Sequence, residues 1–339
     1  MAGGRMTDTM KAVTFINDNN AKLFGILHQP AEKKGDTGII LISSGIKSRV
    51  APHRLYLKMA RQFAEMGYPI LRVDPEGLGD AEGEIEQQWI ADVYCSIETG
   101  LLIKDTIAAI DWMIEECGVE KVILAGLCGG AITALLTGNR DERVSAVLSL
   151  GMPSILASSK VDPTKYITTG QLQTMRDGYL KKALDLDSWK RFLRFQTDYS
   201  LLLKSFFLPM LKKPKAELEK SRKMKASVPV LPEDTNLNPH FPKAFLEFTF
   251  QRKLLLIFSE TDRLYWEFQE KFMHYYEELA NRNGHNFEIH VVKEANHVFS
   301  FGEWQKEMME ISCKWLEDVS APPGYGKSQF NTTCRDSLI

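Results

Sequence analysis

The ten residues VILAGLCGGA (122–131) decide the fold of this chain. An apolar run is followed by a sharp glycine-rich turn and then by small residues that favour a helix, 131–136. Strand, turn and helix, with Gly126 and Gly130 on either side of Cys128, form the pattern of a nucleophile elbow with cysteine where serine is usual. A Cβ at either glycine would collide with the neighbouring strand or helix. The motif leaves one alternative open, a buried cysteine in an ordinary tight turn.

The composition is that of a globular protein with one large domain or two medium ones. The chain has 339 residues, of which 44% are hydrophobic and 25% charged, and its net charge is −2. This balance argues against nucleic acid or an anionic membrane as a partner. No apolar run approaches the roughly 18 residues of a membrane span, and the polar residues 1–18 do not resemble a secretory signal. The five cysteines contain no C-x-x-C pair, so we expect free thiols and a cytoplasmic location.

Alternating apolar and turn-rich segments predict a mostly parallel α/β sheet of eight strands with helices on both faces. The first two strands, 11–16 and 22–28, are separated by Asn-Asp-Asn-Asn, which predicts a hairpin. The remaining predicted strands are 38–43, 68–73, 121–125, 143–150, 253–258 and 287–292. The predicted helices include 53–66, one long helix from Asp92 to Cys117 and a closing helix at 302–318.

The alternation stops after the sixth strand. Residues 152–245 contain no convincing strand, several prolines and many Phe, Leu, Met and Lys residues, which is typical of a helical cap inserted into a sheet. The predicted organisation is therefore a first part of the α/β core at 1–151, a cap at 152–245, a second part of the core at 246–319 and a flexible tail at 320–339.

A cysteine nucleophile needs a base, and the base usually needs a group that orients it. After an elbow of this kind, the acid and then the histidine follow along the chain. Asp262 comes just after the predicted strand 253–258, and His297 comes just after 287–292. Because ligands bind outside the carboxyl ends of parallel strands, these positions favour a Cys128–His297–Asp262 triad. Glu260 is the alternative acid.

Two backbone N–H groups are candidates for an oxyanion hole. The first belongs to Gly129, directly after the nucleophile, and the second to Ile46, in the loop after the predicted strand 38–43. That loop reads Ser-Ser-Gly-Ile-Lys (43–47), and its glycine allows the backbone to turn toward the sulfur. The same loop is also compatible with an ordinary turn.

These residues resemble the α/β-hydrolase superfamily. The elbow, the turn at Asp262, the Ala-Asn-His loop at 295–297 and the segment Asp-Pro-Glu-Gly-Leu-Gly-Asp (74–80) match its layout, although Glu76 and Ala81 depart from the D-x-R-G-x-G-x-S pattern. More closely, 47–56 together with 74–83 is similar to bacterial exosortase-associated hydrolases. Cysteine elbows also occur in dienelactone hydrolases, polyhydroxyalkanoate synthases and some thioesterases.

The resemblance implies an acyl hydrolase or acyltransferase, and the residues specify how it would work. Cys128 attacks an ester or thioester, His297 takes its proton, and Asp262 orients His297. The alternatives are a carboxylester or dienelactone-type hydrolase and a non-catalytic ligand-binding protein on the same scaffold. We expect no cofactor and no metal, because no H-E-x-x-H motif or Cys/His ligand cluster occurs.

The remaining candidates concern substrate binding. Aromatic residues of the cap, among them Phe206 and Phe207, are candidates for an acyl pocket, although core packing also explains them. Ser44 is a further candidate, as are His53 and Arg54, which fit either an anionic substrate group or the start of a helix. The predicted partner is an acyl substrate carried on coenzyme A or an acyl carrier protein, with lysines at 212–225 as a phosphate contact or a solvated face. A homodimer is left open.

Overall fold

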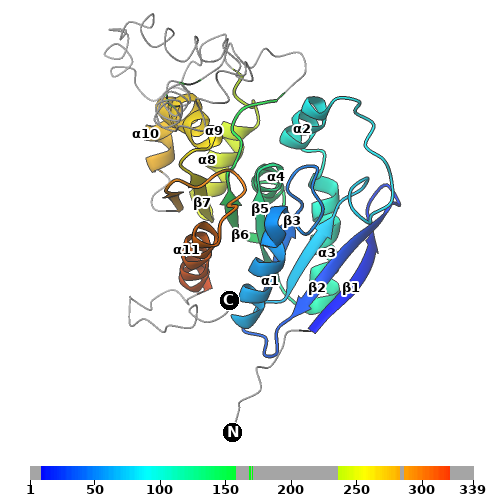
Figure 1. Ribbon diagram of the computed structural model, residues 1–339. Coiled ribbons are helices and arrows are strands. Elements are labelled where there is room, and N and C mark those ends of the chain that lie inside the picture. The colour runs from blue at the N-terminus through cyan, green and yellow to red at the C-terminus, as the bar shows by residue number, and fades with distance from the viewer. Residues whose placement is uncertain (1–8, 158–167, 169, 171–235, 283–285, 321–339) are drawn as a thin grey trace, which may run out of the picture.

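The computed structural model describes residues 9–157, 168, 170, 236–282 and 286–320. They form one eight-stranded sheet and the helices that pack on it (Figure 1). The strand order across the sheet is β1-β2-β4-β3-β5-β6-β7-β8. The bounds of the strands are β1 Thr9–Ile16, β2 Lys22–Gln29, β3 Thr37–Ile42, β4 Ile70–Asp74, β5 Lys121–Leu127, β6 Val144–Leu150, β7 Lys253–Ser259 and β8 Phe287–Val292. The predicted mostly parallel sheet of eight strands is confirmed.

Antiparallel pairing is confined to one edge of the sheet. Strands β1 and β2 form the predicted hairpin, and β2 also pairs antiparallel with β4. All other neighbouring strands run parallel. The carboxyl ends of β3, β5, β6, β7 and β8 therefore lie along one edge, where the loops that follow them can meet.

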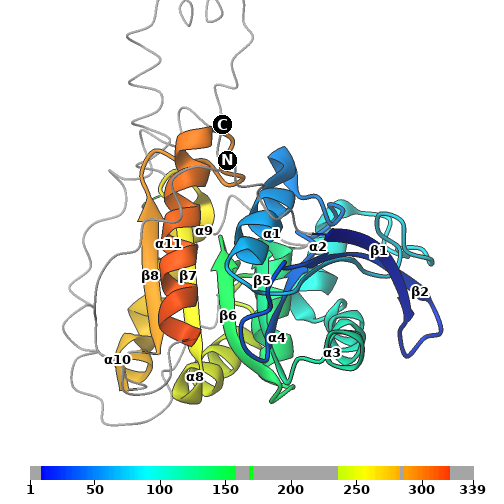
Figure 2. The same ribbon diagram turned by 90° about the horizontal axis from the view of Figure 1, so that it is seen from below.

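Helices cover both faces of the sheet (Figure 2). Their bounds are α1 Leu55–Glu65, α2 Ile90–Thr99, α3 Ile103–Cys117, α4 Gly129–Gly138, α8 Phe241–Gln251, α9 Arg263–Glu267, α10 His274–Arg282 and α11 Gly302–Ser320, with a 3₁₀ turn, η1, at Pro52–Arg54 and a π-helical stretch, η5, at Phe268–Met273. Helices α1 and α11 pack on one face, and α3, α4, α8 and α10 on the other.

The central strands are apolar on both faces because both are covered. In β3, Ile40 and Ile42 belong to the core under α3 and α4, whereas Ile39 and Leu41 belong to the core under α1 and α11. All four side chains are buried. This alternation explains why the strand reads as a continuous apolar run.

The predicted single helix from Asp92 to Cys117 is wrong. The structure has two helices there, α2 and α3, and the first ends at Gly100. Gly100 has φ 116°, a left-handed conformation that glycine adopts without strain, and its N–H bonds to the carbonyls of Ile97 and Ser96. The apolar spacing continues across this break, so periodicity alone could not reveal it.

The predicted cap lies largely outside the described residues, but the two ends of the segment are placed side by side. Ile155 and Leu237 form an antiparallel bridge, and the N–H of Leu156 donates to Asn236. The chain therefore leaves the sheet after β6 and returns at the same place before α8. Helix α8 begins at Phe241, inside the predicted range 152–245, and packs against α4.

Within the described ranges, no helix combines the length and the apolar character needed to cross a lipid bilayer.

Candidate active site

Cys128 lies at the sharp turn between β5 and α4. Its backbone has φ 54° and ψ −116°, a strained conformation for a residue with a Cβ. The turn is held from the next strand, because the N–H of Cys128 donates to the carbonyl of Leu150 over 2.8 Å. The side chain is part-exposed at the N-terminal end of α4.

The two glycines flanking the turn sit where no Cβ fits. A Cβ on Gly126 would lie 2.5 Å from the carbonyl oxygen of Gly130. A Cβ on Gly130 would lie 2.5 Å from the carbonyl oxygen of Ile42 and 2.8 Å from that of Ser43. These obstacles are backbone atoms, so they cannot move aside as a side chain could. The close approach brings the start of α4 against the loop after β3.

The structure brings Asp262 and His297 next to Cys128. The Nδ1 atom of His297, in the loop after β8, lies 2.5 Å from Oδ2 of Asp262, which directly precedes α9. Cys128 lies close enough to the imidazole for its charge to act on the pKa of His297. The other carboxylate oxygen of Asp262 accepts the N–H of Leu264 over 3.2 Å, which fixes the carboxyl group. Three residues from loops after three strands thus lie close together, and two of them, Asp262 and His297, are hydrogen-bonded.

The environment of His297 stabilises its charged form. Burial disfavours the imidazolium, but the hydrogen bond to Asp262 and the charges of Asp262 and Cys128 outweigh burial and raise the pKa of His297 to about 10. The arrangement therefore favours the charged imidazolium form of His297.

Glu260, the alternative acid, has another partner. Its Oε2 atom accepts the backbone N–H of Glu294 over 2.8 Å in an exposed position. Asp262, in contrast, is 8% exposed and bonded to the imidazole. The geometry therefore supports Asp262 as the residue that orients His297.

The two predicted oxyanion donors come from loops that touch. A Cβ on Gly129 would lie 2.8 Å from Cα of Gly45, the residue before Ile46. Among the described residues, the N–H groups of Ile46 and Gly129 donate to no other protein atom. Both groups are therefore free to bind an oxyanion.

The predicted substrate-binding residues separate in space. Ser44 is buried, and its hydroxyl has no hydrogen-bond partner within the described part of the chain. His53 and Arg54 are exposed, each with positive φ, and Arg54 lines a cavity that contains none of the triad residues. Phe206 and Phe207 lie outside the described residues.

Sequence reasoning missed two residues next to the site. Tyr56 is a buried residue of α1 whose hydroxyl accepts the N–H of Leu127, directly before Cys128. Arg263 lies close enough to Cys128 and Asp262 for their charges to act on it. Burial lowers the pKa of Arg263, but the Glu267 carboxylate, 2.7 Å away, is the main reason that the pKa is raised overall. Neither residue has a motif, although the position of Arg263 after Asp262 is a signal that could have been used.

Comparison with known proteins agrees with this geometry at the level of the fold. A scan against protein families finds no match to this chain. The chain is 25% identical over 111 residues to YtaP of Bacillus subtilis (strain 168), a candidate hydrolase, and this match spans 31% of the chain and 37% of YtaP. The chain thus spans little more than a third of the length of that curated relative.

Two solved structures are similar over most of the chain. The Pyrococcus furiosus esterase Pf2001 aligns with a TM-score of 0.55 and 17% identity, covering 92% of this chain and 91% of the esterase. DcsB, solved in complex with its substrate analogue, aligns with a TM-score of 0.53 and 12% identity, covering 92% of this chain and all of DcsB (100%). With its elbow and its sheet of mostly parallel strands, the chain has the α/β-hydrolase fold.

Proposed function

We propose that this protein is an acyl enzyme that forms a covalent thioester on Cys128. One observation carries the proposal: Cys128, on a strained turn, lies close enough to His297 to act on its charge, and Nδ1 of His297 lies 2.5 Å from Oδ2 of Asp262. A nucleophile, a base and a group that orients the base are the parts that such catalysis requires.

The first half of the reaction forms the acyl-enzyme. The Cys128 sulfur, with its proton on His297, attacks the carbonyl carbon of an ester or thioester, and the carbonyl electron pair moves to oxygen. The N–H groups of Ile46 and Gly129 stabilise this oxyanion, each by about 3 kcal/mol. The oxyanion then collapses, and the leaving thiol or alcohol takes the proton from His297.

The second half transfers the acyl group to an acceptor. His297 removes a proton from water, an alcohol, an amine or a thiol as that acceptor attacks the acyl-cysteine. The acyl-cysteine is itself a thioester, so exchange with a thioester substrate is nearly balanced in energy. This chemistry favours a thioesterase or an acyltransferase whose substrate is carried on coenzyme A or an acyl carrier protein.

Mass spectrometry of the intact protein tests the covalent step. After incubation with a short acyl thioester, the wild-type protein is expected to gain the mass of one acyl group on Cys128. Cys128→Ala should gain none. Cys95→Ala is the matched control, because Cys95 is a part-exposed thiol on α2, and this variant should be acylated like the wild type.

An unmodified wild-type protein that binds acyl ligands as tightly as Cys128→Ala would contradict the proposal and support a non-catalytic ligand-binding protein.

Cys128→Ser separates the roles of sulfur and position. Because a serine hydroxyl needs a stronger base, the variant should lose most of its thioester turnover. Full retention would contradict a thiolate mechanism.

The second candidate function is the hydrolysis of carboxylic esters, which the hydrolase and esterase descriptions of YtaP and Pf2001 favour. The ratio of kcat/KM for a thioester and for the oxygen ester of the same acid separates the two. Competition between water and an amine or alcohol acceptor then separates hydrolysis from transfer, because exclusive release of free acid excludes transfer.

A further inference from the structure

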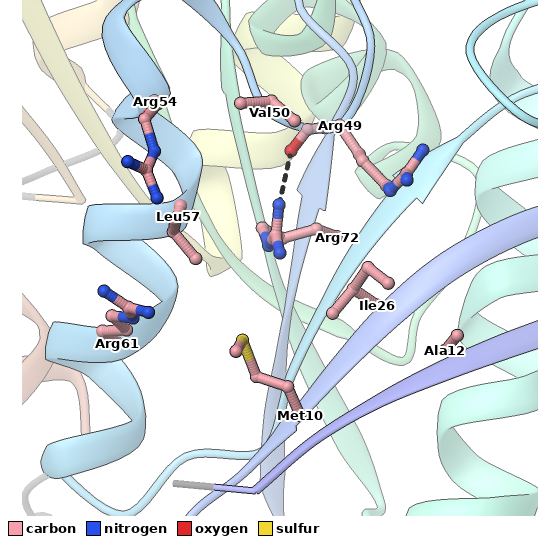
Figure 3. A pocket seen from close by; sticks show the side chains of 9 residues that line it. All are labelled: Met10, Ala12, Ile26, Arg49, Val50, Arg54, Leu57, Arg61 and Arg72. Carbon is pink, nitrogen blue, oxygen red and sulfur yellow. Dashed lines mark hydrogen bonds between the residues drawn. The ribbon is translucent and has the colours of Figure 1, made fainter. Parts of the chain in front are cut away.

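Four arginines line a cavity of about 460 Å³ on the face of the sheet that α1 covers (Figure 3). They are Arg49, Arg54, Arg61 and Arg72. No residue of the Cys128–His297–Asp262 triad lines this cavity. The cavity is therefore separate from the place where the acyl chemistry is proposed.

The floor of the cavity is one rung of the antiparallel edge of the sheet. Ala12 of β1 pairs with Ile26 of β2, and Ile26 pairs with Arg72 of β4. Directly paired residues point to the same face of a sheet. Arg72 lies in the middle of its strand, so the rung is set back from the strand ends that carry the catalytic loops.

The wall of the cavity is one face of α1. Leu57 and Arg61 are four residues apart on α1, which places them on one side of the helix, and Arg54 directly precedes α1. In Figure 3 the Arg54 and Arg61 side chains lie on the helix, across from Arg72. The cavity thus faces cationic groups from two separate elements.

These arginines differ in whether a carboxylate neutralises their charge. Arg49 is neutralised, because its guanidinium pairs with the buried Asp74 and lies 2.7 Å from Asp80. Within the ranges that the structure describes, Arg54 and Arg61 form no ion pair. The cavity therefore carries positive charge without matching carboxylates.

Arg72 is the buried member of the set, at 5% exposure. Its Nε atom donates to Nε2 of His28 over 3.0 Å, and its Nη1 atom donates to the carbonyl of Arg49 over 3.3 Å. Neither acceptor carries a full negative charge. Burial, and then the charges of Arg49 and Arg61, lower the pKa of Arg72. Asp74 opposes them, and the net result is a pKa of about 10. An anion in the cavity would reverse this destabilisation.

The rest of the lining is apolar. Ile26 and Leu57 flank the arginines, and Met10 reaches the same cavity while 53% exposed. Guanidinium groups bind phosphate and carboxylate oxygens in pairs of parallel hydrogen bonds. Three guanidinium groups without a carboxylate partner match a phosphomonoester, which carries about −1.5 to −2 charges at neutral pH, better than a monoanionic carboxylate. We propose that Arg54, Arg61 and Arg72 bind a small phosphomonoester whose apolar part packs on Met10, Ile26 and Leu57.

Isothermal titration calorimetry with hexyl phosphate tests the proposal, using protein whose Cys128 has been alkylated so that the catalytic site is blocked. The alkylated protein should bind hexyl phosphate with an affinity that falls as salt is added. Arg54→Gln and Arg61→Gln should each weaken binding about tenfold, as expected for a charge-assisted hydrogen bond. Both residues are exposed, so the variants should fold.

Arg140→Gln is the matched control, because it removes the same charge from an exposed arginine after α4 and should leave the affinity unchanged. Inorganic phosphate should bind more weakly than hexyl phosphate, since it lacks the apolar part, and hexanoate more weakly because of its single charge. The proposal is overturned if the alkylated protein binds no hexyl phosphate, if Arg140→Gln weakens binding as much as Arg61→Gln, or if hexanoate or inorganic phosphate binds as tightly.

Discussion

The phenol oxygen of Tyr56 accepts a hydrogen bond of 2.6 Å from the backbone N–H of Leu127, directly before Cys128. The same hydroxyl donates to the carbonyl of Ile42 over 2.8 Å. One side chain of α1 therefore links the end of β3, from which the Ile46 loop departs, to the end of β5, which leads into the turn at Cys128. Burial raises the pKa of Tyr56 above its ordinary value, so the hydroxyl stays neutral and keeps both bonds.

Tyr56→Phe tests this link. The substitution leaves the Leu127 N–H and the Ile42 carbonyl buried without their partner, which should lower the free energy of unfolding in urea by about 1–3 kcal/mol. It should also slow alkylation of Cys128 by iodoacetamide, because the turn is held less firmly. Tyr68→Phe is the control, because the Tyr68 hydroxyl bonds to Leu316 of α11 instead. An equal effect of both variants on alkylation would contradict a positioning role for Tyr56.

Gly130→Ala should damage the elbow. The new Cβ would lie 2.5 Å from the carbonyl oxygen of Ile42, and overpacking of this kind typically costs about 1–3 kcal/mol. Thermal unfolding should show a lower Tm for the variant. Gly302→Ala, at the start of α11, meets no atom within 4 Å and should leave Tm unchanged or raise it. An unchanged Tm for Gly130→Ala would mean that the turn tolerates a side chain.

Stability should depend on pH through His297. Its pKa is raised from 6.5 to about 10 on folding, so its contribution is complete below pH 6.5 and is lost as pH rises toward 10. The free energy of unfolding in urea should therefore fall more steeply with pH across this window in the wild type than in His297→Gln. Parallel profiles for the two proteins would mean that the imidazole gains no proton on folding.

Asp74→Asn should be more damaging than the loss of a surface carboxylate. Asp74 is fully buried and accepts the N–H of Arg49 over 2.6 Å in addition to the Arg49 guanidinium. Removing one member of a buried ion pair costs about 3–5 kcal/mol. Asp111→Asn removes an exposed partner of Arg143 and should cost about 0–1 kcal/mol. Equal midpoints in urea would contradict this ranking.

The sequence was most informative where local chemistry and chain order agree. The glycines around Cys128, and the places of Asp262 and His297 just after β7 and β8, predict residues that the structure brings together. The hairpin was predicted from its turn residues. All these predictions rest on short stretches of sequence and do not require the order of the strands in the sheet to be known.

What could not be predicted depends on contacts between distant segments. Tyr56 sits at an apolar position of a helix, where a core residue is the ordinary interpretation. Arg54 and Arg72 come together because α1 packs on β4, a contact that periodicity does not specify. The similarity to exosortase-associated hydrolases stays a prediction.

The loop that carries Ile46 is anchored from β4: Asp74 holds the N–H of Arg49, and Arg72 holds its carbonyl. Mutations in that strand can therefore shift the Ile46 loop relative to Gly129 without changing Cys128, Asp262 or His297. In natural or directed evolution, substitutions in β4 can thus change substrate selectivity while Cys128, Asp262 and His297 stay the same.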